Sequence, residues 1–417
     1  MLFNSAIWII AAAATLGVIA RPWNLPEFVW AVMGATMLLL FNLLPWRTAA
    51  AAVGEGTDVY LFLIGMMLLS EVARKERLFD WLATRAVRHA RGSAKRLFLI
   101  IYVVGALVTA FLSNDATAVV MTPAVYATTR AAQVEPLPYL FICAFIANAA
   151  SFVLPIANPA NLVVFGGQMP ALWDWLRYFA GPSLAAILAT YVALRLTQRR
   201  ALDAKVAAIE VTPPLTPGAT LAAIGIALTV VALLVASAFD RPLGLPTFCA
   251  GACLTAIVLV IARKSPLPVL NDISWGVLPL VAGLFVLVAG LNQTGVLSAL
   301  ARNLHDAAAV SPHATSWIAG IIVAVGTNIV NNLPLGLIAA TTNHAARLPA
   351  QVAGAILIGV DLGPNLSVTG SLATMLWLIA LRRESENVTL HQFLKLGLIV
   401  MPPALLLSLL AFSAMSS

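Results

Sequence analysis

The sequence predicts an all-α polytopic membrane protein with two inverted repeats and about ten spanning helices. Of its 417 residues, 61% are hydrophobic and 10% are charged, whereas about 25% of a soluble chain is charged. Ten or eleven apolar blocks approach the ~20 residues that a helix needs to cross a bilayer. Continuous apolar runs such as 61–70 and 355–360 lack the alternation of β-barrel strands, so a barrel is excluded.

The first repeat is predicted over residues 1–205. A basic amphipathic segment at 74–96 is too charged to cross the membrane and should lie on its surface. A re-entrant hairpin is expected near 97–130, because its apolar chain is interrupted at Ser113, and a broken helix near 137–168. The scaffold spans of this half are expected near 6–20, 27–44, 58–72 and 173–196.

The second repeat is predicted over residues 206–417, after a charged, proline-containing connector. It places a second hairpin near 312–347 and a second broken helix near 350–381. Its other spans are expected near 220–238, 245–262, 275–291 and 393–412. The two halves share few identical residues but the same predicted order of elements, which is typical of an internal structural repeat.

The distribution of basic residues predicts the orientation. Placing the 74–96 cluster in the cytoplasm puts 19 of the 24 Lys and Arg residues there and 5 outside, a strong positive-inside bias. Both termini are then outside, and the two halves are inverted. Residues 1–20 lack a basic start, so we expect no cleavable signal peptide, and the predicted location is the cell's inner (plasma) membrane. The net charge of +7 therefore reflects topology and does not indicate nucleic acid.

The four interruptions predict one central site. Non-helical backbone in lipid leaves polar groups unpaired, so it persists only around a protein-enclosed or wet cavity. Half-helix ends and short polar side chains would then surround a ligand at the midplane. Capping of half-helices is the alternative for any single residue. The candidate ligand-binding residues are Ser113, Asn114, Asp115, Thr117, Asn158, Asn161, Asn331, Asn332, Asn365, Ser367, Thr369 and Ser371.

Asp115 and Asp361 are the acidic residues within these breaks. A carboxylate at bilayer depth costs at least ~2.5 kcal/mol unless it is partnered, hydrated or protonated, so acids there are functional by default. Both are predicted to couple proton movement, with structural hydrogen bonds as the alternative.

Other reactive side chains carry less weight. His344 lies near the outer interface, where we expect it to be solvated. Cys143, Cys249 and Cys253 could be assembled into a three-thiol metalloid site, but they lie outside the breaks, so we interpret them as packing residues. We expect no structural metal and no cofactor.

Four motifs carry a resemblance to a known family. The segments SNDATAVVMTP, ANAASFVLPIANPANLVVF, TNIVNNLP and GVDLGPNLSVTGSLATMLW resemble the ArsB-type arsenite and antimonite efflux permeases of the ion transporter superfamily. The resemblance covers nearly the whole chain, and the last motif is the most specific to the arsenical branch. It implies substrate contact near Asn114, Asp115, Asn158, Asn332 and 365–371, and elevator-like movement of the hairpin domain.

The resulting expectation is a secondary transporter, not an enzyme, that exports neutral arsenite or antimonite in exchange for protons. The breaks contain no basic residue, which disfavours an anionic cargo. No Walker motif occurs, so ATP use would need a separate cytoplasmic arsenical ATPase, which the resemblance implies as an optional partner. The alternatives are a sodium/proton antiporter on the same fold and a membrane-embedded enzyme, for which no metal or acidic cluster motif is present.

Overall fold

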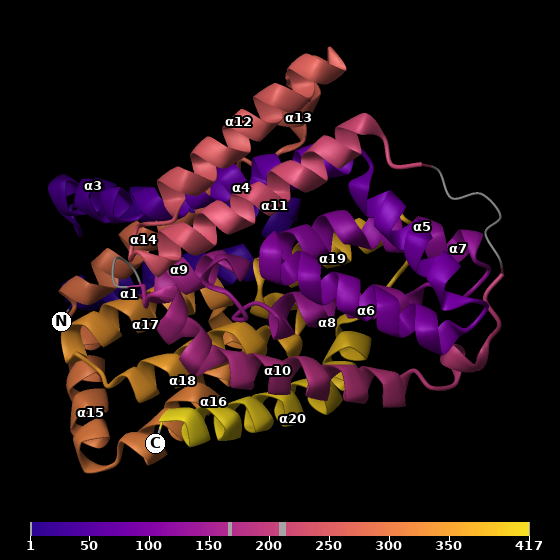
Figure 1. Cartoon of the computed structure of the whole chain (residues 1–417). Helices are drawn as coiled ribbons and strands as arrows, with labels where there is room; N and C mark the ends of the chain where they lie inside the picture. The colour runs from indigo at the N-terminus through magenta and orange to yellow at the C-terminus, as the bar shows by residue number, and fades with distance from the viewer. Residues whose placement is uncertain (1, 166–168, 208–213, 417) are drawn as a thin grey trace.

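A computed structural model describes residues 2–165, 169–207 and 214–416 (Figure 1). This part of the chain is helical, and its one β-bridge joins Ser93 to Lys205. The predicted all-helical membrane architecture is confirmed.

The first half begins with three helices and continues into a long one. These are α1 (Leu2–Ala20), α2 (Glu27–Leu40), α3 (Trp46–Glu55) and α4 (Thr57–Lys75). The basic segment forms α5 (Leu78–Ala90) and is followed by α6 (Ala94–Phe111), the π-helical turn η2 (Ala116–Met121) and α7 (Thr122–Ala131). Next come α8 (Leu137–Ala149), the short turn η3 (Pro155–Ala157), α9 (Pro159–Phe165) and α10 (Leu172–Thr197).

The second half of the chain is also helical. It opens with α11 (Pro217–Ala238), α12 (Gly244–Ala262), α13 (Leu267–Asp272), α14 (Val277–Gln293) and α15 (Val296–Val310). It continues with α16 (Pro312–Val330), α17 (Asn332–Ala346) and α18 (Ala350–Leu362). Two short turns, η6 (Gly363–Asn365) and η7 (Val368–Gly370), lead to α19 (Leu372–Arg383) and α20 (Leu390–Ser416). The inverted relation of the two halves and their boundary stay a prediction of the sequence.

Helices from the two halves pack against one another. Helix α4 packs along α12, α2 along α14 and α10 along α20. At the α4–α12 crossing, Gly65 and Gly251 lie so close to the facing backbone that a Cβ at either would collide with it. Small residues allow such approaches between helices in membranes. Both chain ends lie at one end of the molecule, and α5 lies at the other (Figure 1).

The number of spanning helices depends on what is counted. Six helices in the described ranges are long and apolar enough to cross, or up to eight if each bent pair forms one span. The bent pairs are α3 with α4, at 46°, and α14 with α15, at 76°. The sequence count of about ten also includes shorter apolar helices such as Glu27–Leu40 and Leu137–Ala149.

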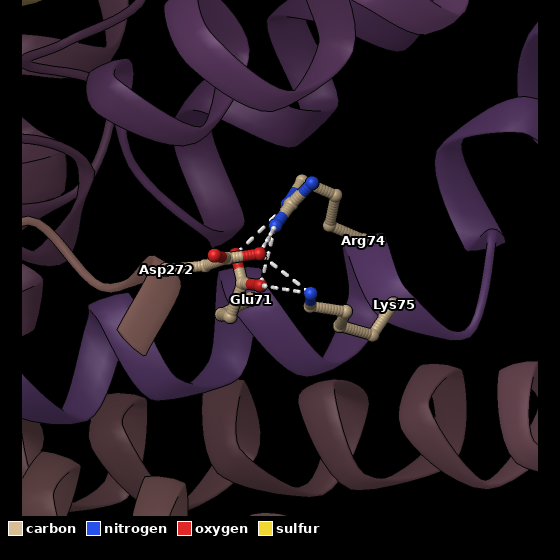
Figure 2. Close-up of polar contacts among 4 residues, drawn as sticks. All are labelled: Glu71, Arg74, Lys75 and Asp272. Carbon is tan, nitrogen blue, oxygen red and sulfur yellow. Dashed lines mark hydrogen bonds and ion pairs between the residues drawn. The ribbon is translucent and has the colours of Figure 1, made fainter. Parts of the chain in front are cut away.

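The structure contains two short helices that the hydropathy pattern did not predict, α3 and α13. Ion pairs hold α13 in position, because Asp272 at its end accepts hydrogen bonds from Arg74 at 2.7 Å and from Lys75 at 2.5 Å. The same two cations face Glu71 one turn earlier in α4, with its Oε1 2.6 Å from Arg74 Nη2. Figure 2 shows the four side chains converging between the two helices. This cluster ties the end of α4 to the chain between α12 and α14.

Candidate transport site

The two broken helices meet at their breaks. Asn158, just before α9, donates from Nδ2 to Oδ1 of Asp361 at 2.7 Å. On the other side of the breaks, Asn148 in α8 donates to Oδ1 of Asn365 at 3.0 Å. All four side chains are at least 98% buried. Residues about 200 positions apart therefore join into one polar contact inside the bundle.

Asn161 supports the backbone of the first break. Its Nδ2 donates to the carbonyl oxygens of Ser151, Leu154 and Pro155, at 2.9 to 3.3 Å. These carbonyls lie in the irregular chain between α8 and α9, where that of Leu154 also accepts from the N–H of Ala157 at 3.0 Å. A carbonyl left without a donor there would be costly in a dry interior. One amide thus stabilises the irregular chain that sets Asn158 against Asp361.

Asn148 is the centre of a second group of bonds. Its Nδ2 also approaches Oγ1 of Thr374 at 3.3 Å, and its Oδ1 accepts from Ser371 at 3.3 Å. Ser371 in turn caps α19 by accepting from the backbone N–H of Thr374 at 3.1 Å. Asn365 donates to the carbonyl of Phe145 at 3.1 Å. The side chains of Asn365 and Ser371 therefore form their hydrogen bonds with other protein groups.

The tip of the second hairpin is a single residue with unusual backbone geometry. Asn331 separates α16 from α17 with φ 75° and ψ 152°, a backbone conformation that residues other than glycine rarely adopt. Its Oδ1 accepts from the N–H of Leu333 at 3.3 Å, and its Nδ2 donates to the carbonyl of Thr369 at 3.1 Å. The tip is therefore tied to the second break.

Asn328 strengthens this attachment one turn before the tip. Its Nδ2 donates to the carbonyl of Gly363 at 2.9 Å, and its Oδ1 accepts from Ser367 at 2.7 Å. Its own carbonyl accepts from Thr369 at 3.0 Å. Hairpin α16–α17 and the break after α18 thus form one hydrogen-bonded unit.

The tip of the first hairpin has its own contacts. Ser113 caps the turn by accepting from the N–H of Ala116 at 3.3 Å, and Thr117 shares a 2.8 Å hydrogen bond with Thr109. Asn114 accepts from the N–H of Asp115 at 2.9 Å. The half-buried carboxylate of Asp115 accepts no hydrogen bond from the described residues. The following π-helical turn, a form frequent at functional sites, packs on α8 and α19.

The candidate residues therefore fall into separate groups. Asn158 bonds to Asp361, and Asn365 and Ser371 both bond to Asn148. Asn331 bonds to Thr369, whose hydroxyl bonds to Ser367. No hydrogen bond joins Ser113, Asn114, Asp115 or Thr117 to the other groups within the described ranges.

Sequence reasoning missed Asn148 and Asn328. Each lies inside an apolar helix before its break, while the prediction considered only the breaks themselves. Polar residues within apolar spans were the signal that could have identified both.

A cavity of about 970 Å³ opens beside this region, between α17 and α9 on one side and α4, α14 and the loop that joins α11 to α12 on the other. Leu337 and Thr341 of α17 line it, as do Val163 of α9 and Phe285 of α14. His344 is exposed at the same cavity, as expected from the sequence.

The cysteine interpretation needs a correction. Cys143 is buried in α8, but Cys249 and Cys253 are exposed on α12, so the packing interpretation is wrong for those two. An apolar helix facing lipid exposes its small apolar side chains, and the hydropathy of the sequence does not separate that from burial in protein. Among the described residues, no three His, Cys, Asp or Glu side chains are grouped to hold a metal ion.

The apolar helices, with their breaks and buried polar contacts, define a multi-pass membrane protein, and its family is one of transporters rather than enzymes. Residues 6–359 match the citrate transporter family, CitMHS, and the chain belongs to that family within the ion transporter superfamily.

Curated relatives cover most of the chain. An "Arsenical pump membrane protein" of Escherichia coli is 25% identical over 99% of this chain and 98% of its own length. The protein of the same description in Yersinia enterocolitica is 28% identical over 84% of each chain. An uncharacterized transporter of Synechocystis is 23% identical over 91% of each.

A solved structure has a similar fold. The YdaH transporter of Alcanivorax borkumensis, described as having an unusual topology, superposes with a TM-score of 0.58 and 18% identity. The match covers 89% of this chain and 87% of that one. This similarity concerns the fold alone.

Proposed function

We propose that the protein exports trivalent arsenic or antimony from the cytoplasm, as the neutral trihydroxide, in exchange for protons. The observation that carries the proposal is Asp361, a fully enclosed acid at the crossing of the two broken helices with a neutral amide as its partner. Such an acid is suited to taking up and releasing a proton. The choice of a metalloid as the cargo rests on the relatives described as arsenical pump membrane proteins.

A neutral cargo fits the groups around this crossing. The breaks offer amides, hydroxyls and two carboxyls, and their sequence contains no Lys or Arg. Anions such as citrate are bound in proteins by Arg, Lys or clusters of backbone N–H groups. An uncharged hydroxide needs only hydrogen-bonding partners. This favours a neutral cargo for this chain, even though its family is described as one of citrate transporters.

In an alternating-access cycle, the cavity would be the path by which the cargo leaves. With the basic α5 in the cytoplasm and both termini outside the inner membrane, the cavity opens outward and serves as the exit for cargo. Movement of the hairpin domain past α4 and α14 would close it. On the resemblance, a cytoplasmic arsenical ATPase is an optional partner.

The decisive test is arsenite uptake into everted membrane vesicles under an imposed pH gradient. Uptake that exceeds equilibration and collapses with a protonophore supports the proposal. A matched vesicle preparation without the protein sets the background. Absence of gradient-driven uptake from well-expressed protein contradicts it.

A sodium/proton antiporter is the second candidate, because the buried Oδ2 of Asp361 accepts no hydrogen bond from the part of the chain that the structure describes, and a carboxylate oxygen is a suitable cation ligand. Sodium-dependent proton flux in the same vesicles, without arsenite uptake, would favour it.

A further inference from the structure

The end of the molecule that carries α5 has a positively charged surface built from two distant parts of the chain (Figure 1). One part is the turn from α5 into α6, and the other is the end of α10 with the short turn η5 (Ala201–Asp203) that follows it. Six exposed residues make up this basic surface, namely Arg88, Arg91, Arg96, Arg199, Arg200 and Lys205.

The chain after α10 is held against the turn between α5 and α6. Lys205 pairs with Ser93 in the β-bridge, and the N–H of Val206 donates to the carbonyl of Gly92 at 3.1 Å. Leu202 and Val206 are 2% and 6% exposed, so apolar burial anchors this segment. The basic residues of the two parts are therefore neighbours in space.

The positive charge of this surface is not balanced within the protein. Asp203 is the one acid in 88–96 and 199–205, and it pairs with Lys95 at 2.7 Å. The six residues of the basic surface form no ion pair with any residue that the structure describes. Arg96 also lies in the first turn of α6, where the helix dipole disfavours a cation. An anion from outside the protein would compensate both effects.

Lipid-facing stripes lead to the basic surface along two helices. Exposed apolar residues recur every four positions on α6, at Leu99, Val103, Leu107 and Phe111. They recur in the same way on α10, at Leu184, Leu188, Val192 and Leu196.

These two helices are neighbours, because Tyr102 of α6 donates to the carbonyl of Ile187 in α10 at 2.6 Å. Both are long and apolar enough to cross a membrane, so their exposed stripes contact lipid tails. Arg96 and Arg199 each lie three residues beyond the end of a stripe. The basic surface therefore begins at the depth of the lipid headgroups.

Insertion of α5 into the bilayer does not explain this surface. An amphipathic helix that binds a membrane by insertion buries its apolar face in the lipid. In α5 that face, with Leu78, Phe79 and Val87, is buried in the protein against α6 and α7. What α5 offers to the membrane is its charge.

We propose that the basic surface binds the headgroups of anionic phospholipids. The phosphate oxygens accept hydrogen bonds from the guanidinium groups, which match phosphate geometry, while the acyl chains lie on the stripes of α6 and α10. In the predicted orientation this is the inner leaflet. The inference does not depend on which cargo is transported.

The test is lipid binding to purified full-length protein in a neutral detergent, measured by native mass spectrometry. Phosphatidylglycerol and phosphatidylcholine with the same acyl chains are compared, since choline neutralises the phosphate charge. The wild type should bind phosphatidylglycerol about tenfold more tightly, as expected from one net charge-assisted contact. Raising the ionic strength from about 0.1 M to about 1 M shortens the Debye length from about 10 Å to about 3 Å, so this preference should fall several-fold.

Three sets of substitutions locate the binding. Arg91→Gln, Arg96→Gln and Arg200→Gln together should lower the preference towards onefold. Lys at the same three positions keeps the charge and should keep most of the preference. A matched control replaces three exposed arginines predicted on the other side of the membrane with Gln, namely Arg47, Arg177 and Arg302. It removes the same charge and should bind as the wild type does.

Only variants with a wild-type elution profile are compared, and if none has one, the salt dependence of the wild type decides. Equal binding of the two lipids by the wild type, or a preference that salt does not change, refutes the proposal. So does a tenfold preference that survives the three Gln substitutions in the basic surface. Inorganic phosphate that displaces phosphatidylglycerol would assign the charges to a soluble anion, and polyglutamate that binds in its place would point to an acidic protein; either result would also refute it.

Discussion

Replacing Asp361 with Asn should separate binding of the cargo from its uphill transport. The substituted side chain keeps an oxygen that accepts the 2.7 Å hydrogen bond from Asn158, so the crossing of the broken helices is preserved. It removes the titrating group. Arsenite binding should therefore be weakened but retained, whereas coupling to protons should be lost.

The size of the effect follows from the gradient. Exchange of one proton down a gradient of one pH unit supplies about 1.4 kcal/mol, which corresponds to tenfold accumulation of a neutral cargo. In everted vesicles, the wild type should approach that ratio, and Asp361→Asn should not exceed equal concentrations on the two sides. Asp115→Asn should show the same loss if both acids carry protons.

The control is arsenite binding to the purified variants, which must remain measurable. If Asp361→Asn and Asp115→Asn each accumulate arsenite at the wild-type level under the same gradient, the proton carrier lies elsewhere and the coupling hypothesis is wrong.

Three further predictions concern residues around the site and at the surface. Asn148→Ala leaves the buried partners Asn365 and Ser371 short of bonds, so it should destabilise the protein by about 2 kcal/mol; an unchanged melting temperature in detergent would show that the second group of bonds is dispensable. Replacing Cys143, Cys249 and Cys253 together with Ser should preserve arsenite transport, because Cys143 is buried away from the breaks and the other two are exposed on α12; transport lost at normal expression would implicate a thiol. Hydrogen bonds from Lys75 and Arg74 lower the pKa of Asp272, so its stabilising contribution is complete above the ordinary value of about 3.9 and is lost as the pH falls through the lower folded value. Asp272→Asn should therefore melt slightly below the wild type at pH 7, and the difference should shrink as the pH falls below the ordinary value. A difference that stays constant with pH would contradict this assignment.

The sequence predicted the helical elements well because its signals are local. The apolar segment that was expected to begin near 97 forms α6, which begins at Ala94. The segment that was expected to end near 130 forms α7, which ends at Ala131. Hydropathy and the cost of unpaired backbone in lipid act on the segment itself, without reference to distant contacts. The short α13 was missed because its position depends on ion pairs with α4.

What the sequence determined by itself was the membrane class, the places where helices break and the chemical types available at those breaks. Only the tertiary structure decided which of these residues meet. Asn158 and Asp361 are 203 positions apart, and their contact depends on how two broken helices cross. The sequence likewise did not show that Asn365 is hydrogen-bonded while the buried Oδ1 of Asn332 accepts no hydrogen bond from the described residues. The physical reason is that hydropathy is a property of each segment, whereas hydrogen-bond satisfaction in a buried site depends on all the segments packed around it.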